Sequence, residues 1–114
     1  LLGHGYEVAE TSGVRLRFHL EALPLLPGAR EYAADSLFPG GSCRNRDAYS
    51  RHVEFAASIA EEDQLLLFTP ETSGGLLLSV PAAHREELLT RFAATGEPAW
   101  VVGEVLEGRG IEVM

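Results

Sequence analysis

The chain has 114 residues and a formal net charge of −8, from 17 acidic and nine basic residues. Hydrophobic residues make up 46% of it, which is typical of a packed globular domain and excludes a disordered segment. The acidic balance disfavours binding to the phosphate backbone of a nucleic acid. All nine basic residues are arginine, which excludes a P-loop lysine and a Schiff-base lysine within this chain.

Cysteine usage and hydropathy indicate the cellular compartment in which the protein works. Cys43 is the single cysteine, so the chain has no internal disulfide and no metal cage built from several cysteines. This usage is typical of a reducing compartment, and we expect a cytoplasmic protein with no membrane contact. The chain begins with Leu1 and no initiator Met, inside a predicted helix, so we expect residues 1–114 to be a single domain of a longer polypeptide.

A short helix is predicted over Leu1–Glu10, because apolar residues return after about two turns and Gly13 suits the left-handed residue that follows a helix. Gly3 and Gly5 each destabilise a helix interior by about 1 kcal/mol relative to alanine. We therefore expect close packing at both glycines, or the approach of another segment to the backbone.

Val14–Leu20 gives the clearest strand signal of the chain. Its apolar residues alternate with Arg15, Arg17 and His19, which predicts one buried face and one face in water. His19 is thus interpreted as a solvated strand residue and not as a ligand.

The middle of the chain is predicted to be helical with loops. We expect a helix over Ala29–Leu37 with Tyr32, Ala33 and Leu37 inward, a glycine-rich loop over Phe38–Arg46, and a helix over Asp47–Ala57. Ser58 and Glu61 have the spacing of a capping box. The acidic run that begins at Glu61 then lies in a first helical turn, where the helix dipole favours carboxylates without any metal.

The last third combines strands with one more helix. Leu76–Val80 is continuously apolar and predicts a strand covered on both faces. Pro81 suits the start of a helix that runs to Thr95 and ends at Gly96, with a buried stripe of Leu88, Leu89 and Phe92. Trp100–Leu106 and Ile111–Val113 predict a hairpin. Mixed helices and strands with a hairpin indicate the α+β class.

Two polar segments are candidate ligand contacts. Thr72-Ser73-Gly74-Gly75 combines hydroxyls with paired glycines, which suits an anion-binding turn; an ordinary tight turn before a strand is the alternative. Arg44-Asn45 follows a glycine pair, and a guanidinium fork suits phosphate; a salt-bridged surface loop is the alternative. Cys43 lies beside Arg44 and Arg46 in the sequence, whose positive charges favour a reactive thiolate, and an incidental or structural role is the alternative. No catalytic residue and no metal site is predicted.

Taken in order, several motifs resemble the C-terminal domain of the selenide, water dikinase (selenophosphate synthetase) family. They are Leu1-Leu2-Gly3-His4, Gly13-Val14, Leu23-Pro24-Leu25-Leu26-Pro27-Gly28-Ala29, Gly40-Gly41 with Arg44-Asn45, Pro70-x-Thr72-Ser73-Gly74-Gly75-Leu76-Leu77 and Val101-Val102-Gly103-Glu104-Val105. Together they cover nearly the whole chain. Thr69-Pro70-Glu71 departs from the family's Asp-Pro-Gln, which puts any polar contact of that aspartate in doubt here.

The resemblance implies a layered α/β/α domain with a mixed sheet, as in the superfamily that includes aminoimidazole ribonucleotide synthetase. It also implies the C-terminal part of a homodimeric enzyme that makes selenophosphate from selenide, ATP and water with Mg²⁺ present, releasing AMP and phosphate. The family's reactive cysteine or selenocysteine, its lysine and its metal-binding aspartates lie upstream of this segment, and Cys43 does not match the reactive position.

In that family an N-terminal domain of the same chain holds most of the ATP site, and the C-terminal domain closes the cleft. We therefore expect this chain alone to bind no cofactor and to be inactive. Residues expected near phosphate or nucleotide are Arg44, Asn45, Thr72, Ser73, Gly74 and Gly75, with the backbone at Gly3 and Gly5 facing the cleft. The alternatives are a sibling enzyme in purine biosynthesis, thiamine-phosphate phosphorylation or hydrogenase maturation, and a non-catalytic interaction module.

Overall fold

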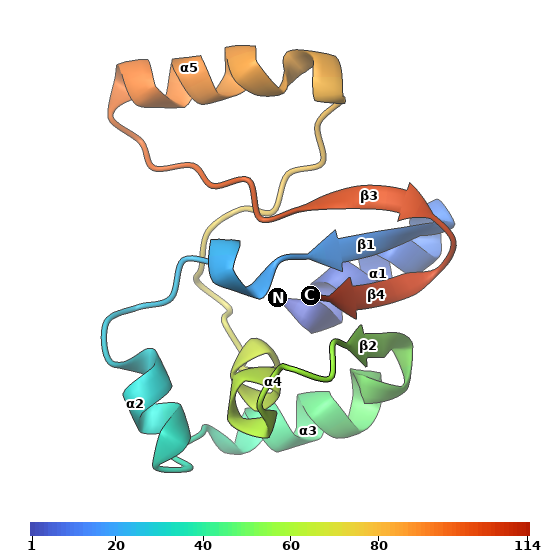
Figure 1. Ribbon diagram of the computed structural model, residues 1–114, viewed down its shortest axis with the longest axis vertical. Coiled ribbons are helices and arrows are strands. Elements are labelled where there is room, and N and C mark those ends of the chain that lie inside the picture. Colours follow the sequence, from blue (N-terminus) through green and yellow to red (C-terminus); the bar gives the residue numbers. More distant parts are fainter.

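The computed structural model describes residues 1–114 and is built around one four-stranded sheet (Figure 1). Along the sheet the strands follow the order β2-β4-β1-β3; β1 is antiparallel to β3 and parallel to β4, and β2 is parallel to β4. The sheet is therefore mixed, and the predicted α+β class is confirmed. The strands are β1 (Val14–Phe18), β2 (Val53–Phe55), β3 (Gly103–Glu107) and β4 (Gly110–Val113).

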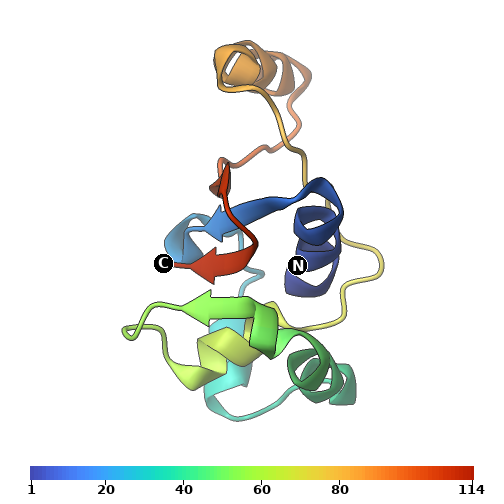
Figure 2. The ribbon, with the colours of Figure 1, turned by 90° about the vertical axis from the view of Figure 1, so that its right-hand side faces the viewer.

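The helices are distributed unevenly around this sheet. Helix α1 packs against one face, α2, α3 and α4 gather beyond β2, and α5 stands apart beyond β3 (Figures 1 and 2). No helix has both the length and the apolar character that crossing a bilayer requires. The α-helices are α1 (Leu2–Ser12), α2 (Ala29–Ala34), α3 (Gly40–Tyr49), α4 (Glu61–Leu67) and α5 (Arg85–Thr95); the 3₁₀ turns are η1 (Leu20–Ala22), η2 (Ser50–His52) and η3 (Ala82–His84).

Helix α1 confirms the prediction for the start of the chain. It ends at Gly13, whose φ of 66° is the left-handed conformation that glycine adopts without strain. A Cβ atom on Gly5 would lie 3.4 Å from Ile111 Cδ1 and 3.6 Å from the Phe18 ring. The absent side chain at Gly5 thus lets α1 approach the sheet, and the buried Leu2 and Ala9 add to this contact.

The predicted hairpin between the last two strands is wrong. Glu107 and Gly110 are joined by two residues, yet β3 and β4 lie on opposite sides of β1. The physical reason is burial: between β1 and β2, Ile111 is 1% exposed and Val113 is fully buried. As the outer strand of a hairpin, β4 would leave one edge of both side chains open to water.

The sheet face opposite α1 carries a ladder of ion pairs instead of a helix. Because side chains alternate along a strand, Arg15 and Arg17 project away from the buried Leu16 and Phe18. Arg15 pairs with Glu54 and, at 2.9 Å, with Glu112; Arg17 pairs with Glu112 and, at 3.0 Å, with Glu104. The ladder crosses all four strands and matches the predicted wet face of the first strand.

The region around α5 differs most from prediction. Leu76–Val80 forms no strand, and the Leu76 side chain is 89% exposed. Helix α5 ends at Gly96 as predicted, with a φ of 73°, but none of its residues is buried. The segment pairs with none of the four strands, whose order in the sheet is β2-β4-β1-β3.

The helices between β1 and β2 also differ from those predicted. Helix α2 is shorter than predicted, and of its expected inward residues only Ala33 is buried, while Tyr32 and Leu37 are about 60% exposed. The predicted glycine-rich loop contains helix α3. Ser58 does not cap α4, because Ala60 precedes its first residue; the acidic residues nevertheless occupy its first turn.

The ladder predicts a specific pH dependence of stability. Hydrogen bonding to Arg17, together with the charge of Arg15, lowers the pKa of Glu112 below its ordinary value of 4.5. A carboxyl group whose pKa is lowered by folding stabilises the fold at pH values above its ordinary pKa. This stabilisation is lost as the pH falls through the pKa of the folded state. We expect urea unfolding midpoints to fall in that acid range, and to fall less for Glu112→Gln.

The matched control for this experiment is Glu107→Gln, which removes a β3 carboxylate that makes no ion pair. Its pH profile should follow that of the unaltered chain. Identical profiles for Glu112→Gln and the unaltered chain would show that the ladder does not contribute to acid stability.

Candidate functional site

The chain that leads to the Thr72–Gly75 turn passes the beginning of α3, the helix that carries Arg44 and Asn45. Pro39 precedes the helix without capping it through a side chain, so the first N–H groups of α3 have no side-chain partner. The sequence predicted a loop for Arg44 and Asn45. In the structure both residues lie in the second turn of α3. A proline just before paired glycines was the signal for this helix start, since proline is common where helices begin.

Asn45 fixes the geometry of the site. Its side-chain Nδ2 donates a hydrogen bond of 2.9 Å to the backbone carbonyl of Phe68, the residue that follows α4. Phe68 is itself buried, 2% exposed. This bond uses an Asn45 donor within the protein, so the structure places Asn45 as a support for the chain that leads to the Thr72–Gly75 turn.

Close packing between Gly41 and Pro70 brings the turn to α3. A Cβ atom on Gly41 would lie 2.7 Å from Pro70 Cγ and 3.3 Å from Pro70 Cδ, which is too close for two carbon atoms. Thr69 reinforces the approach, because its Oγ1 donates a 2.8 Å hydrogen bond to the Leu66 carbonyl. The second glycine of the pair is thus required by this contact, which sequence reasoning missed.

The Thr72–Gly75 turn is exposed along its whole length, and its hydroxyls face solvent. Neither Gly74 nor Gly75 has a positive φ, and a Cβ on Gly75 would meet nothing within 4 Å. The conformational freedom inferred for the paired glycines is therefore not used in this conformation. The turn is a free, polar surface that is anchored only at Pro70.

Arg44 is the one arginine of the nine with neither an ion pair nor a side-chain hydrogen bond. Its side chain is exposed and lies back over the first turn of α3, with Nη1 3.6 Å from the Cβ position of Gly40. A cation beside a helix N-terminus is electrostatically unfavourable unless an anion lies between them. This arrangement is suited to an anionic ligand.

The close packing predicted at the two glycines of α1 is confirmed, while the predicted role of their backbone in facing a cleft stays a prediction. Gly5 is buried against the sheet and does not face an open cleft. Gly3 lies under Tyr49, whose ring would be 3.0 Å from a Cβ there. The start of α1 is nevertheless near the chain that leads to the turn, because the Leu1 backbone nitrogen lies close enough to Glu71 to feel the charge of its carboxylate.

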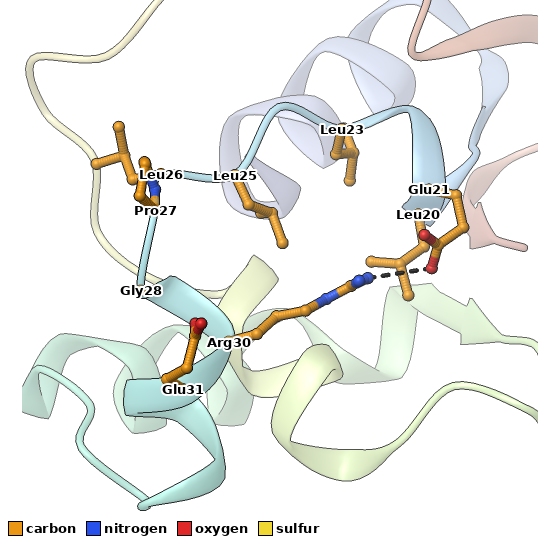
Figure 3. Close-up of a pocket in the computed structure, with 9 residues that line it drawn as sticks. All are labelled: Leu20, Glu21, Leu23, Leu25, Leu26, Pro27, Gly28, Arg30 and Glu31. Atoms are coloured by element: carbon orange, nitrogen blue, oxygen red, sulfur yellow. Dashed lines mark hydrogen bonds and ion pairs between the residues drawn. The ribbon is translucent and has the colours of Figure 1, made fainter.

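A cavity of about 290 Å³ lies away from these residues, between η1 and α2 (Figure 3). Leu23, Leu25 and Leu26 line it, so the proline-rich family motif forms its wall. Arg30 reaches across it to Glu21 at 3.1 Å and also bonds Asp63 at 3.2 Å. Both ion pairs engage the guanidinium of Arg30, so the only arginine that lines the cavity is already paired with carboxylates.

The remaining reactive groups are dispersed. Cys43 is exposed on α3. No group of three or more His, Cys, Asp or Glu side chains is placed to hold a metal ion. The chemistry that this surface supports is electrostatic contact with an anion.

The contact at Gly41 gives a matched pair of substitutions. Alanine is a better helix former than glycine by about 1 kcal/mol, so Gly40→Ala, whose Cβ meets only the flexible end of Arg44, should raise the free energy of unfolding by no more than that. Gly41→Ala forces Pro70 away and should lower it by about 1 to 3 kcal/mol. Equal effects in urea unfolding would show that Pro70 does not pack on α3.

Comparison with known proteins agrees with this placement of motifs. Residues 1–114 match the family model described as "AIR synthase related protein, C-terminal domain". Proteins named selenide, water dikinase are similar: that of Pelobacter propionicus is 43% identical over 93% of the chain, that of Caldanaerobacter subterraneus 41% over 99%, and that of Clostridium botulinum 38% over 94%. The chain spans about a third of each relative, 31%, 33% and 31%. It belongs to the family of C-terminal domains of AIR synthase related proteins.

Proposed function

We propose that this chain is the C-terminal domain of an ATP-dependent enzyme that forms selenophosphate from selenide, ATP and water, releasing AMP and phosphate. The relatives named selenide, water dikinase, which match nearly the whole chain at 38–43% identity, support this reaction over that of a sibling enzyme. The chain spans about a third of each relative, which is consistent with a further domain in the same polypeptide.

In this proposal the N-terminal domain binds most of ATP and the Mg²⁺ ion, the full-length protein is a cytoplasmic homodimer, and this domain closes the cleft. The observation that carries the proposal is Arg44. Its guanidinium is free of carboxylates and lies at the N-terminus of a ten-residue helix. A guanidinium binds phosphate oxygens through two parallel hydrogen bonds, and helix N–H groups add to the attraction.

The Thr72–Gly75 turn supplies the other side of this phosphate contact. Its hydroxyls and backbone N–H groups are exposed, and the Pro70–Gly41 contact keeps its base beside α3. Asn45 acts through the Phe68 carbonyl as a positioning residue. In this arrangement Arg44 and the turn bind and orient phosphate oxygens, while the reacting groups are supplied from outside this chain.

The test uses the full-length protein and measures selenide-dependent formation of AMP. Arg44→Gln removes a charge-assisted hydrogen bond to phosphate, so we expect kcat/KM for ATP to fall by about tenfold or more. Arg46→Gln is the matched control, because Arg46 lies on the same helix and is already paired with Glu61 at 3.3 Å. We expect kcat/KM for ATP to change little in this variant.

Two further outcomes bear on the proposal. The 114-residue chain alone is expected to release no AMP from ATP and selenide. Turnover by this chain alone would contradict the division of labour between the two domains. A full-length protein without selenide-dependent AMP formation would contradict the reaction itself.

A further inference from the structure

One carboxylate lies beside the turn that would contact phosphate oxygens. Glu71 directly precedes this turn, and its Oε2 lies 3.9 Å from the Cβ position of Gly74. Its Oε1 lies 3.3 Å from Thr69 Oγ1, on the side where the chain enters the turn. Both Glu71 and the turn are exposed. A ligand that reaches the hydroxyls of the turn therefore also comes close to a negative charge.

Glu71 has no arginine partner that would neutralise this charge. None of the ion pairs of the domain includes it. The Leu1 amino group is close enough to feel its charge, but in the proposed full-length protein that nitrogen belongs to a peptide bond and is neutral. Because like charges repel, a bare phosphate at the turn is disfavoured by Glu71.

Arg44 and Glu71 lie on the two sides of one packing contact without pairing. Gly41 and Pro70 form this contact, since a Cβ atom on Gly41 would lie 2.7 Å from Pro70 Cγ. Glu71 directly follows Pro70, and the Arg44 guanidinium lies over Gly40, the neighbour of Gly41. A free guanidinium on one side and a free carboxylate on the other suit a ligand that carries both signs of charge.

A phosphate group complexed with a divalent cation is a ligand of this kind. Mg²⁺ is commonly bound through one or two carboxylates together with substrate phosphates, and it keeps several of its water molecules. The domain has no group of three or more His, Cys, Asp or Glu side chains placed to hold a metal ion, so it offers no site for the cation alone. A single carboxylate is sufficient where phosphate oxygens and water supply the other ligands.

We propose that Glu71 makes this contact selective for phosphate that is complexed with a divalent cation. The inference rests on the proposed function, in which Arg44 and the turn bind phosphate oxygens. Glu71 supplies one oxygen ligand to a cation on that phosphate. When no cation is present, the same carboxylate repels the phosphate and lowers its affinity.

Equilibrium binding of β,γ-methylene-ATP to the full-length protein tests the inference without any reaction. Glu71→Gln removes the charge and keeps the size of the side chain. We expect this variant to bind the Mg²⁺ complex of the analogue at least about tenfold more weakly, since even residues that only orient a metal ligand contribute about that much to metal affinity. In EDTA it should bind the metal-free analogue more tightly than the unaltered protein does, because the repulsion is removed.

The two opposite changes separate this role from the alternatives. Weaker binding under both conditions would show a damaged site, and tighter binding under both would show that Glu71 only repels. Either result, or unchanged binding, would overturn the proposal.

Glu107→Gln is the matched control, because it removes an exposed carboxylate on β3 that makes no ion pair. It should bind both forms of the analogue as the unaltered protein does, and the same reversal in this control would overturn the assignment to Glu71. The binding assay contains no selenide. A protein that shows the reversal at Glu71 but forms no AMP with selenide would therefore contradict the proposed reaction and leave the role of Glu71 in place.

Discussion

Strand β4 joins two halves of the domain that share no other sheet contact. On one side it pairs with β2, which leads into the helices beyond it, and on the other with β1 and thus with α1 and β3. Main-chain bonds continue the pairing on both sides, from Ala56 to the Val113 carbonyl and from Met114 to the Phe18 carbonyl. Burying Ile111 and Val113 contributes about 1.5 to 3 kcal/mol each. The final strand is therefore the element on which the shared core depends.

The same strand organises the opposite face of the sheet. Glu112 lies between Ile111 and Val113 and thus projects to the side where Arg15 and Arg17 stand on β1. A one-residue slip of β4 would turn the carboxylate into the core and an apolar side chain into water. Charge pairing and burial therefore specify one register together. The surface pairs are individually weak, and their contribution lies in this specificity more than in stability.

Sequence reasoning succeeded where a local pattern was sufficient and failed where long-range competition decided. The left-handed Gly13, the alternation around Arg15 and the first-turn carboxylates of α4 depend on neighbours in the chain, and all three were predicted correctly. The place of β4 depends on which strand occupies the position between β1 and β2. A local sequence pattern does not predict this, because the competing strands are far apart in the chain. The same holds for the site: the residue types were visible, but the Gly41–Pro70 and Asn45–Phe68 contacts that assemble it join segments more than twenty residues apart.

The proposed phosphate site lies where the fixed part of the chain ends. Phe68 is the last buried residue before Ile111, and Pro70 is held against α3, whereas the Thr72–Gly75 turn beyond it is free on all sides. Arg44 belongs to α3, whereas the turn leads into the segment Leu76–Val80, which forms no strand. An anion that contacts both binds best to the conformation that brings them together, and it shifts the population toward that conformation. In the proposed function, ligand binding therefore restrains the six residues that connect Thr69 to Leu76.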